Sequence, residues 1–412
     1  MADSSQRLQR RVRFPFLVFY GVGTMVGGGF YALSGEIAGR VGLHAPLAFA
    51  LAGGLALLTA LSFAEFSGRL PHSGGSARYV EEAFGRPWLS ALVGWLVIST
   101  GVVSAATLAV ATTGFLRDLA PLPSAPTTIL LVLAMGLIAA WGIAEAVAAV
   151  VLITLLQIGS LLYILLSEGE VLGSLPAQAS AILAPADLGA VAGIVGAAFL
   201  AFYAFIGFED MVTVAGEVQD VRRTLPAAVI ISLLLTTALY ISVSTVAVLA
   251  VPSAAMAAAD TPLARVVAEQ GQLAVTAIVL VSMLAGVNSA LVQLVMAARV
   301  AYGMAERRVA PQWLALIDAR THTPLRATAI ATLLVLVLAL AFALAPLAEA
   351  TSAIILVVFT LVNLGLVRIK RRQPDPPASV PRLPLWVPIA GALVSASLLL
   401  FQIARWLTTV GG

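Results

Sequence analysis

Two apolar stretches of the chain contain groups that can hold a charged ligand. The first, YGVGTMVGGGFYALSG over 20–35, has glycine at six of its sixteen positions. The second, FLAFYAFIGFEDMVTVAGEV over 199–218, contains the adjacent carboxylates Glu209 and Asp210. Glycine costs about 1 kcal/mol in a helix interior relative to alanine, and a carboxylate in apolar surroundings needs water, a proton or a partner. Both stretches therefore predict an interrupted helix whose freed backbone groups line a cavity or meet a ligand.

Helix packing is the alternative explanation for the glycines. Gly23 and Gly27 are spaced G-x-x-x-G, and such spacings commonly permit close helix contact in membranes. Gly27, Gly28 and Gly29 are consecutive, which exceeds what packing requires. We therefore expect Gly21 and Gly23 to pack against neighbouring helices and the triplet to lie in unwound backbone.

The composition places both stretches in a membrane. The chain has 412 residues, of which 60% are hydrophobic and 10% charged, and its mean hydropathy is +1.02. A helix needs about 20 apolar residues to cross the hydrocarbon core. About eleven such stretches follow one another, at 16–38, 45–67, 88–115, 127–144, 147–166, 189–214, 226–250, 272–304, 325–345, 347–367 and 384–406. The fourth and fifth, and the ninth and tenth, are nearly continuous, so ten or twelve crossings remain open.

Residues for enzyme chemistry are scarce. The chain has no cysteine, which excludes thiolate metal sites, and its histidines, His44, His72 and His322, fall in separate predicted loops. The only lysine, Lys370, falls in a predicted inner loop, which removes a Walker A loop and a lysine Schiff base within the membrane. We therefore expect no enzyme activity, no metal and no cofactor.

The basic residues predict the orientation of the chain. With the N-terminus in the cytoplasm, all but four of the 23 basic residues fall on the inner side, the exceptions being Arg40, Arg117, Arg265 and Arg405. This distribution follows the positive-inside rule and indicates a multi-pass protein of the cell membrane. Because the arginines divide between loops in this way, the net charge of +3 does not indicate a nucleic-acid partner.

The two interrupted stretches also predict the internal organisation. They begin about 180 residues apart and occupy matching places in two halves, which is typical of a transporter built from inverted repeats. We expect one repeat over about 14–167, a second over about 188–368 and an additional helix over about 384–407. No loop is longer than about twenty residues, so 1–412 is expected to form a single membrane domain.

Four sequence blocks carry a family resemblance. The stretch from Gly21 to Phe30 matches a G-x-G-x-x-x-G-[small]-G-[I/V/F]-F type signature, and further blocks follow at 63–95, 202–226 and 297–317. With these blocks the chain resembles the amino acid-polyamine-organocation (APC) transporters. The resemblance implies an all-α, leucine-transporter-type fold of two inverted five-helix repeats plus one extra C-terminal helix. It also implies transport of an amino acid or related amine by alternating access.

The resemblance assigns a substrate site to the two interruptions. It implies that the amide groups of Gly27, Gly28 and Gly29 bind the substrate carboxylate, where the positive end of a half-helix favours an anion. Family members often have serine at the middle position, so at Gly28 carboxylate binding is expected to depend on the backbone alone. The substrate ammonium is expected at carbonyl groups of both interruptions, from Thr24, Met25, Tyr203, Ala204, Phe205 and Ile206.

Side chains near the interruptions complete the implied site. Tyr203 occupies the position of an aromatic gate over the substrate, with a packing tyrosine as an equal alternative. Met25, Phe205 and Ile206 make the pocket apolar, which favours a neutral, hydrophobic or small amino acid. The third and eighth helices are expected to add polar side chains, unless these only bond neighbouring helices: Thr100, Ser104, Asn288, Ser289 and Gln293.

Coupling is expected to involve acidic residues. Gln157 stands where many proton-coupled or exchanging relatives have a lysine, and its amide cannot titrate. The resemblance therefore favours exchange or a carboxylate-based proton route, with Glu209 as proton site or gate and Asp210 as its partner. Glu65 matches an acidic position near the inner side, where a structural bond to the inner loops is the alternative. Glu217 lies where an inner-gate salt network is expected.

The leading interpretation is a secondary active amino acid transporter, working as an exchanger or proton symporter. An amine or polyamine exchanger remains open, because Glu209 and Asp210 would suit an amine. A membrane sensor without transport is less favoured, because no output domain is attached. The substrate, the direction of transport and the oligomeric state remain open.

Overall fold

The computed structural model describes residues 12–70, 75–142, 147–318, 320–377 and 380–410. Its α-helices are α1 (Phe14–Met25), α2 (Gly28–Val41), α3 (Ala45–Arg69), α4 (Gly75–Phe84), α5 (Pro87–Leu119), α6 (Ser124–Trp141), α7 (Val147–Ser167), α8 (Leu175–Leu183), α9 (Leu188–Phe202), α10 (Val221–Ala250), α11 (Ser253–Ala257), α12 (Pro262–Val266), α13 (Gln272–Glu306), α14 (Leu325–Ala341), α15 (Leu344–Arg372) and α16 (Trp386–Val410). Its 3₁₀ helices are η2 (Gly42–His44), η3 (Gly169–Ser174), η4 (Tyr203–Phe205), η5 (Phe208–Glu217), η6 (Ala268–Gln270) and η7 (Gln312–Ala315).

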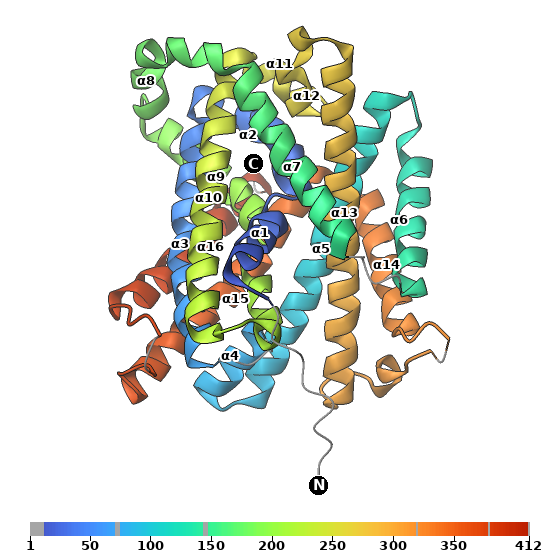
Figure 1. Ribbon diagram of the computed structural model, residues 1–412, viewed down its shortest axis with the longest axis vertical. Coiled ribbons are helices and arrows are strands. Elements are labelled where there is room, and N and C mark those ends of the chain that lie inside the picture. Colours follow the sequence, from blue (N-terminus) through green and yellow to red (C-terminus); the bar gives the residue numbers. More distant parts are fainter. Residues whose placement is uncertain (1–11, 71–74, 143–146, 319, 378–379, 411–412) are drawn as a thin grey trace.

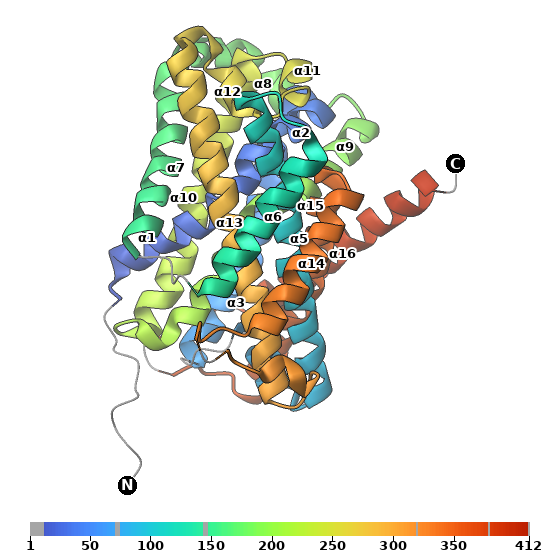
Figure 2. The same ribbon diagram turned by 90° about the vertical axis from the view of Figure 1, so that its right-hand side faces the viewer.

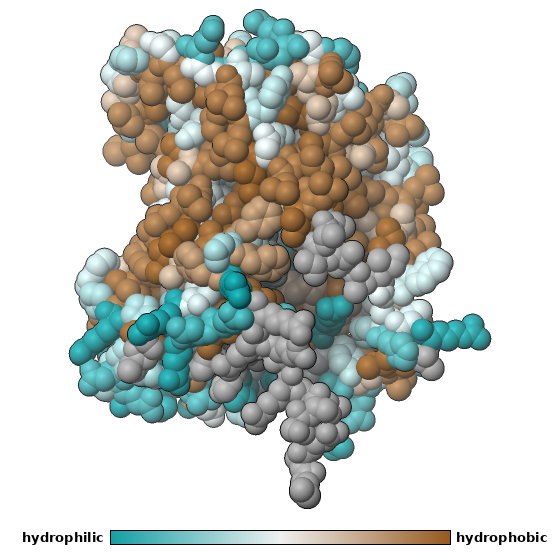
Figure 3. Space-filling model, in the orientation of Figure 1, coloured by the Kyte–Doolittle hydropathy of each residue, from teal (hydrophilic) through white to brown (hydrophobic). Residues whose placement is uncertain are grey.

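The helices form a polytopic membrane protein. Within the described residues, eight helices are long and apolar enough to cross a membrane, or nine if Val151–Ser167 and Gly169–Leu183 form one bent span. In this count α2 and α3 form one continuous helical segment, Gly28–Arg69, and the shorter helices α1 and α14 are not included. Each of the eleven predicted stretches overlaps one or more of the α-helices given above, with α1 and α14 included. Figure 3 shows an apolar belt between two more polar ends, as a bilayer requires.

The first predicted span is interrupted. Helix α1 has Pro15 in its first turn, where its missing N–H is not needed. It ends at Met25, and Val26 and Gly27 are not helical before α2 begins at Gly28. The interruption predicted from the glycines is therefore present, two residues long.

The sixth predicted span is interrupted as well. Helix α9 begins after Asp187, whose side chain accepts a hydrogen bond from the Ala190 amide at 2.7 Å. It ends at Phe202, and the 3₁₀ turn η4 follows and leads to Ile206, whose backbone is extended. Gly207 follows with φ of +132°, a conformation that favours glycine. The chain then resumes as the tighter helix η5.

The arrangement of the helices places both interruptions inside the bundle, where residues 25–27 and 203–207 are buried. Helix α1 lies in the middle of the view in Figure 1 and runs inward from one face of the molecule in Figure 2, whereas α6 and α14 lie at one side in Figure 1. Helix α4 lies at one end and α8, α11 and α12 at the other (Figures 1 and 2). The most extensive contacts between helices are those of α5 with α13 and of α3 with α10. Helix α16 extends away from the bundle toward the C-terminus (Figure 2).

Two predictions about the loops are wrong. Lys370 does not lie in a loop, because α15 continues to Arg372 and ends in a turn of basic residues, which complement the negative end of a helix. Short helices, α4, α8, α11 and α12, occupy regions that the hydropathy pattern assigns to loops. These helices are too short to produce a membrane-span signal.

Candidate functional site

The two interruptions are joined directly. The hydroxyl of Thr24, in the last turn of α1, lies 2.9 Å from the Gly21 carbonyl and 3.2 Å from the Gly207 carbonyl. The Tyr240 hydroxyl, from α10, lies 2.8 Å from the Met25 carbonyl and 3.2 Å from the Ala204 carbonyl. Each hydroxyl can donate to either of its two carbonyls, so side-chain hydroxyls that bind backbone carbonyls hold the ends of α1 and α9 together.

Glu209 accepts a hydrogen bond from a backbone amide of the second interruption. Its side chain is buried, and one carboxylate oxygen accepts the Gly207 amide at 2.9 Å. An anionic acceptor makes a stronger hydrogen bond with an amide than a neutral one does. The contact therefore stabilises the turn at Gly207, the residue with positive φ.

Each glycine of the triplet has a close neighbour. A Cβ atom at Gly27 would meet the Ser289 hydroxyl, and one at Gly29 would meet the Tyr203 ring. At Gly28 it would come within 2.7 Å of the Gly286 Cα in α13. Packing thus accounts for glycine at all three positions. The expectation that the triplet lies in unwound backbone is right only for Gly27 and wrong for Gly28 and Gly29, which form the first turn of α2. The Gly28 amide itself donates to the Ser289 hydroxyl at 3.3 Å.

Tyr203 joins the second interruption to α5. Its hydroxyl lies 2.9 Å from the Ser104 hydroxyl and donates to the Ser104 carbonyl at 3.3 Å. Its ring lies against Gly29. Phe205 packs its ring against Tyr240, with centroids 5.2 Å apart. These aromatic residues are buried and close the space between the interruptions, α5 and α10.

Two cavities border the interruptions. The larger, of about 380 Å³, is lined by Val12, Phe16, Leu17, Phe19, Tyr20, Gly23, Thr24, Val151, Thr154, Asp210, Val214, Glu217, Asn288, Ser289, Val292 and Gln293. The smaller, of about 260 Å³, is lined by Gly75, Ser76, Ala77, Gly94, Val97, Thr100, Ile206, Glu209, Asp210, Thr213, Gln293, Met296, Val300 and Ile355. The two cavities share Asp210 and Gln293, so they meet at these side chains.

The charges around the cavities have one sign. Glu209, Asp210 and Glu217 are acidic, and the described residues that line the cavities include no lysine, arginine or histidine. None of these three acids takes part in an ion pair within the described part of the chain. The arrangement can therefore attract cationic groups.

The structure gathers only part of the predicted set at the cavities. The residues that line them are Thr24, Thr100, Ile206, Glu209, Asp210, Glu217, Asn288, Ser289 and Gln293. The remaining predicted residues near the interruptions are not among the lining residues and form the wall behind them: Met25, Gly27, Gly28, Gly29, Ser104, Tyr203, Ala204 and Phe205. The Met25 and Ala204 carbonyls, expected to receive the ammonium, already accept Tyr240.

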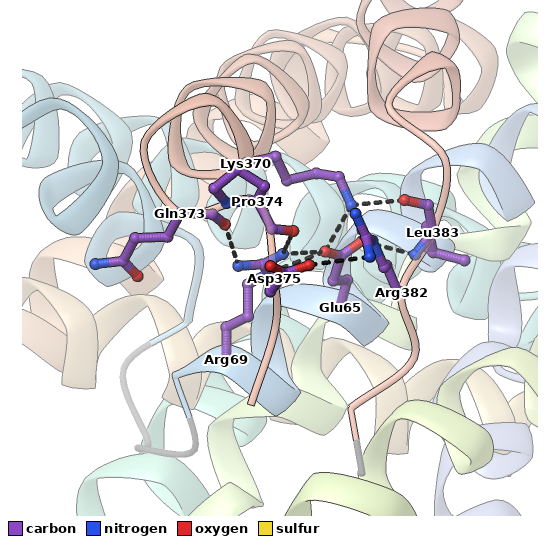
Figure 4. Close-up of polar contacts among 8 residues, drawn as sticks. All are labelled: Glu65, Arg69, Lys370, Gln373, Pro374, Asp375, Arg382 and Leu383. Atoms are coloured by element: carbon purple, nitrogen blue, oxygen red, sulfur yellow. Dashed lines mark hydrogen bonds and ion pairs between the residues drawn. The ribbon is translucent and has the colours of Figure 1, made fainter. Parts of the chain in front are cut away.

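Glu65 belongs to a separate network, shown in Figure 4. Its carboxylate is fully buried and meets the Lys370 ammonium at 2.7 Å, Arg69 at 2.7 and 2.9 Å, and the Leu383 amide at 3.2 Å. Lys370 also donates to the Leu383 carbonyl, and Arg69 to the Gln373 and Pro374 carbonyls. Glu65 therefore fastens the 373–383 connector to α3 and α15, which matches the structural alternative for this residue.

Gln157 lies in the interior of α7 but not at the cavities. Its backbone carbonyl accepts the Tyr31 hydroxyl at 2.8 Å. Both polar atoms of its side chain are buried and have no hydrogen-bond partner within the described residues. Its expected role in coupling stays a prediction.

Tyr240 is a residue at the candidate site that the sequence did not single out. It contacts both interruptions, and its ring stacks on Phe30 with centroids 4.0 Å apart. The available signal was a single phenol in the apolar stretch 226–250, since a buried tyrosine hydroxyl usually finds a partner. The sequence could not indicate that its partners would lie in two other helices.

This architecture is that of a polytopic transporter of the leucine-transporter type. The crystal structure of MhsT in complex with L-phenylalanine superimposes with a TM-score of 0.69 over 96% of this chain and 99% of that chain, at 16% identity. A family model described as amino acid permease matches residues 14–410. The chain therefore belongs to the amino acid permease family, and the resemblance to APC transporters is confirmed.

Characterised relatives differ in what they are named for. The branched-chain amino acid permease BcaP of Bacillus subtilis is 25% identical over 99% of this chain and 91% of its own length. Cationic amino acid transporter 3, mitochondrial, of Arabidopsis thaliana is 28% identical over 91% of this chain and 64% of its own length, so this chain spans just under two thirds of that relative. The methylthioribose transporter of Bacillus subtilis is 26% identical over 95% and 88%. Similarity supports amino acid transport in general and leaves the side chain of the substrate undecided.

Proposed function

We propose that the protein is a secondary active transporter that moves amino acids across the cell membrane by alternating access. The main support is the link between the two interrupted helices at the border of two cavities. Thr24 binds the Gly207 carbonyl directly, and Tyr240 bridges the Met25 and Ala204 carbonyls. Such discontinuous helices supply amide and carbonyl groups to a substrate at mid-membrane depth. We take 14–167 and 188–368 as the two repeats and 384–407 as the additional helix.

The Gly28–Ser289 contact suits the substrate carboxylate. The amide-to-hydroxyl distance of 3.3 Å is long for a hydrogen bond, so a carboxylate can replace the hydroxyl oxygen as acceptor. The displaced Ser289 hydroxyl can then donate to the same carboxylate. Ser289 lines the larger cavity, which gives the ligand access to its hydroxyl, and the buried Gly28 amide lies directly behind that hydroxyl.

The cavities are consistent with a state open to the inner side. The elements that line them include α1, α4 and η5, and no described lining residue of these two cavities belongs to α11 or α12. A third cavity, of about 340 Å³, lies at the α11 and α12 end, is lined by Ala257 and Pro262, and has no residue of either interruption among its described lining residues. With the N-terminus in the cytoplasm, the α4 end of the molecule is the inner end. Tyr203 and its contacts with Ser104 and Gly29 form the closed side of the site.

Coupling is proposed to be exchange or proton symport, with Glu209 as the proton site. Glu209 is buried, borders the smaller cavity and holds the Gly207 turn. Loss or gain of a proton there would change the hydrogen bond that shapes the interruption. Gln157 cannot supply a proton, since an amide does not titrate. If Glu209→Gln still concentrates substrate on a proton gradient in proteoliposomes, the proton site lies elsewhere.

Uptake by purified protein tests the function. Proteoliposomes loaded with an unlabelled amino acid mixture are expected to accumulate a labelled member of that mixture in a saturable manner. Protein-free liposomes give the background. No uptake and no exchange across a broad amino acid panel would contradict the proposal.

Amine or polyamine exchange is a second candidate function. The observation that favours it is the presence of Glu209, Asp210 and Glu217 at the cavities without a basic lining residue in the described part of the chain. An amine without a carboxylate would need only the acidic part of the site. Transport of cadaverine, but of no amino acid, would favour this function over the first.

A further inference from the structure

Among the acidic residues that the structure describes, Asp210 alone lies at both of these cavities. Its side chain borders both cavities, as does that of Gln293 across from it on α13. No hydrogen bond or ion pair to the Asp210 carboxylate occurs among the described residues. The Gln293 Oε1 atom is buried and also has no hydrogen-bond partner in this part of the chain. The junction of the cavities therefore presents the Asp210 carboxylate and the Gln293 Oε1 atom without a partner in this part of the chain, beside the N–H groups of the Gln293 amide. An unsatisfied buried acceptor such as Gln293 Oε1 is costly.

Glu209 and Asp210 are adjacent in sequence but differ in what they are free to bind. A Glu209 oxygen accepts the Gly207 amide, so this carboxylate shapes the interruption. The backbone carbonyl of Asp210 accepts the Thr213 hydroxyl, but its carboxylate is left for a ligand. An ammonium group has three donors and no acceptor, so it can donate to both the Asp210 carboxylate and the Gln293 Oε1 atom.

The wall that leads to Asp210 is apolar. Ile206, at the second interruption, begins it, and the smaller cavity continues along Val97, Met296, Val300 and Ile355. A 3₁₀ helix rises about 2.0 Å per residue, so Asp210 lies about 6 Å along η5 from Gly207. A lysine side chain has a four-carbon stem and an ammonium head, and such stems pack along apolar surfaces while the charge reaches a polar group.

We propose that the site selects amino acids with a cationic side chain, with the stem along Ile206, Val97 and Met296 and the charged head between Asp210 and Gln293. This inference rests on the proposed function, because the interruptions must hold the amino acid backbone. It reconciles the apolar wall, which alone favours a neutral side chain, with the acidic junction. The relatives named for branched-chain and for cationic amino acids are similarly distant in sequence, so the proposal for the substrate side chain is based on the geometry of the cavities.

Lysine and two analogues separate the parts of the proposal. Norleucine has the same stem without the ammonium, and cadaverine has both amines without the carboxylate. In wild-type proteoliposomes, labelled lysine uptake is expected to be competed about 10- to 100-fold better by lysine than by norleucine, the range for a hydrogen bond to a charged group. Equal or better competition by norleucine overturns the inference but leaves amino acid transport intact. Absence of uptake for every amino acid overturns the proposed function instead.

Substitutions test the assignment of the head group. Asp210→Asn and Gln293→Leu are each expected to reduce the lysine preference over norleucine at least about tenfold, since each removes an acceptor at the junction. Asp118→Asn, which removes an exposed aspartate at the far end of α5, is the matched control and keeps the preference. If a transporting Asp210→Asn variant keeps the full preference, the charged head does not bind there. The wild-type comparison decides the question if either variant fails to fold.

Discussion

The molecule contains two groups of buried or half-buried acidic side chains that are built in opposite ways. Glu65 has no exposed surface, and its carboxylate meets two cations and a backbone amide (Figure 4). Asp210 and Glu209 border cavities whose described lining residues include no base. A buried charge is tolerated when it is paired, or when water or a ligand reaches it. The comparison teaches that burial alone does not mark a functional acid, since the acids proposed to act are those that border a cavity and have no cationic partner among the described residues.

The largest expected effect concerns the paired acid. Glu65→Gln leaves Arg69 and Lys370 buried without a carboxylate, and breaking a buried ion pair costs about 3–5 kcal/mol. We expect a strong fall in the thermal unfolding midpoint of the purified protein in detergent. Asp210→Asn, which removes an unpaired charge, is expected to leave the midpoint unchanged or to raise it. Equal losses in the two variants would break the comparison.

The next effect concerns the glycine triplet. A leucine at Gly28 would collide with the Gly286 backbone and with Leu108, forcing α2 away from α13. Because a displacement of about 1 Å can cost about 100-fold in the rate of a positioned process, uptake is expected to fall by at least that factor. Membrane insertion, measured as yield, is expected to persist. Gly54→Leu is the control, because a Cβ at Gly54 meets nothing within 4 Å. Normal substrate binding by Gly28→Leu would place the site elsewhere.

A smaller effect is expected at Tyr240. Tyr240→Phe keeps the ring that stacks on Phe30 but removes the hydroxyl that reaches the Met25 and Ala204 carbonyls. Loss of a donor to a buried acceptor costs about 1–3 kcal/mol, so we expect a decrease in transport of about tenfold. Tyr163→Phe, on the exposed face of α7, serves as the control with no expected change. Uptake by Tyr240→Phe at the wild-type rate would show that the two interruptions do not depend on this link.

The interruptions could be predicted because their signals are local. Consecutive glycines in 20–35 and two adjacent acids in 199–218 conflict with an apolar helix wherever the rest of the chain lies. Both helices are broken where these residues occur. The leucine-transporter-type fold followed from the same signals, through their matching places in two halves and their family pattern.

The partners of the acids could not be predicted, because they are distant in sequence. Glu65 and Lys370 are 305 residues apart, and Tyr240 lies 215 residues from Met25. A basic turn at the end of an apolar helix looks like a loop in hydropathy alone, which misplaced Lys370. The difference between Glu65 and Asp210 therefore became visible only in three dimensions.

Exchange of lysine by the reconstituted protein tests the central claim most directly. Labelled lysine is supplied outside proteoliposomes that contain unlabelled lysine, with empty vesicles and Gly28→Leu vesicles as references. We expect saturable accumulation of label in the loaded wild-type vesicles, weak competition by norleucine, and no accumulation with Gly28→Leu. Accumulation of neutral amino acids in preference to lysine, or equal accumulation by wild type and Gly28→Leu, would contradict it.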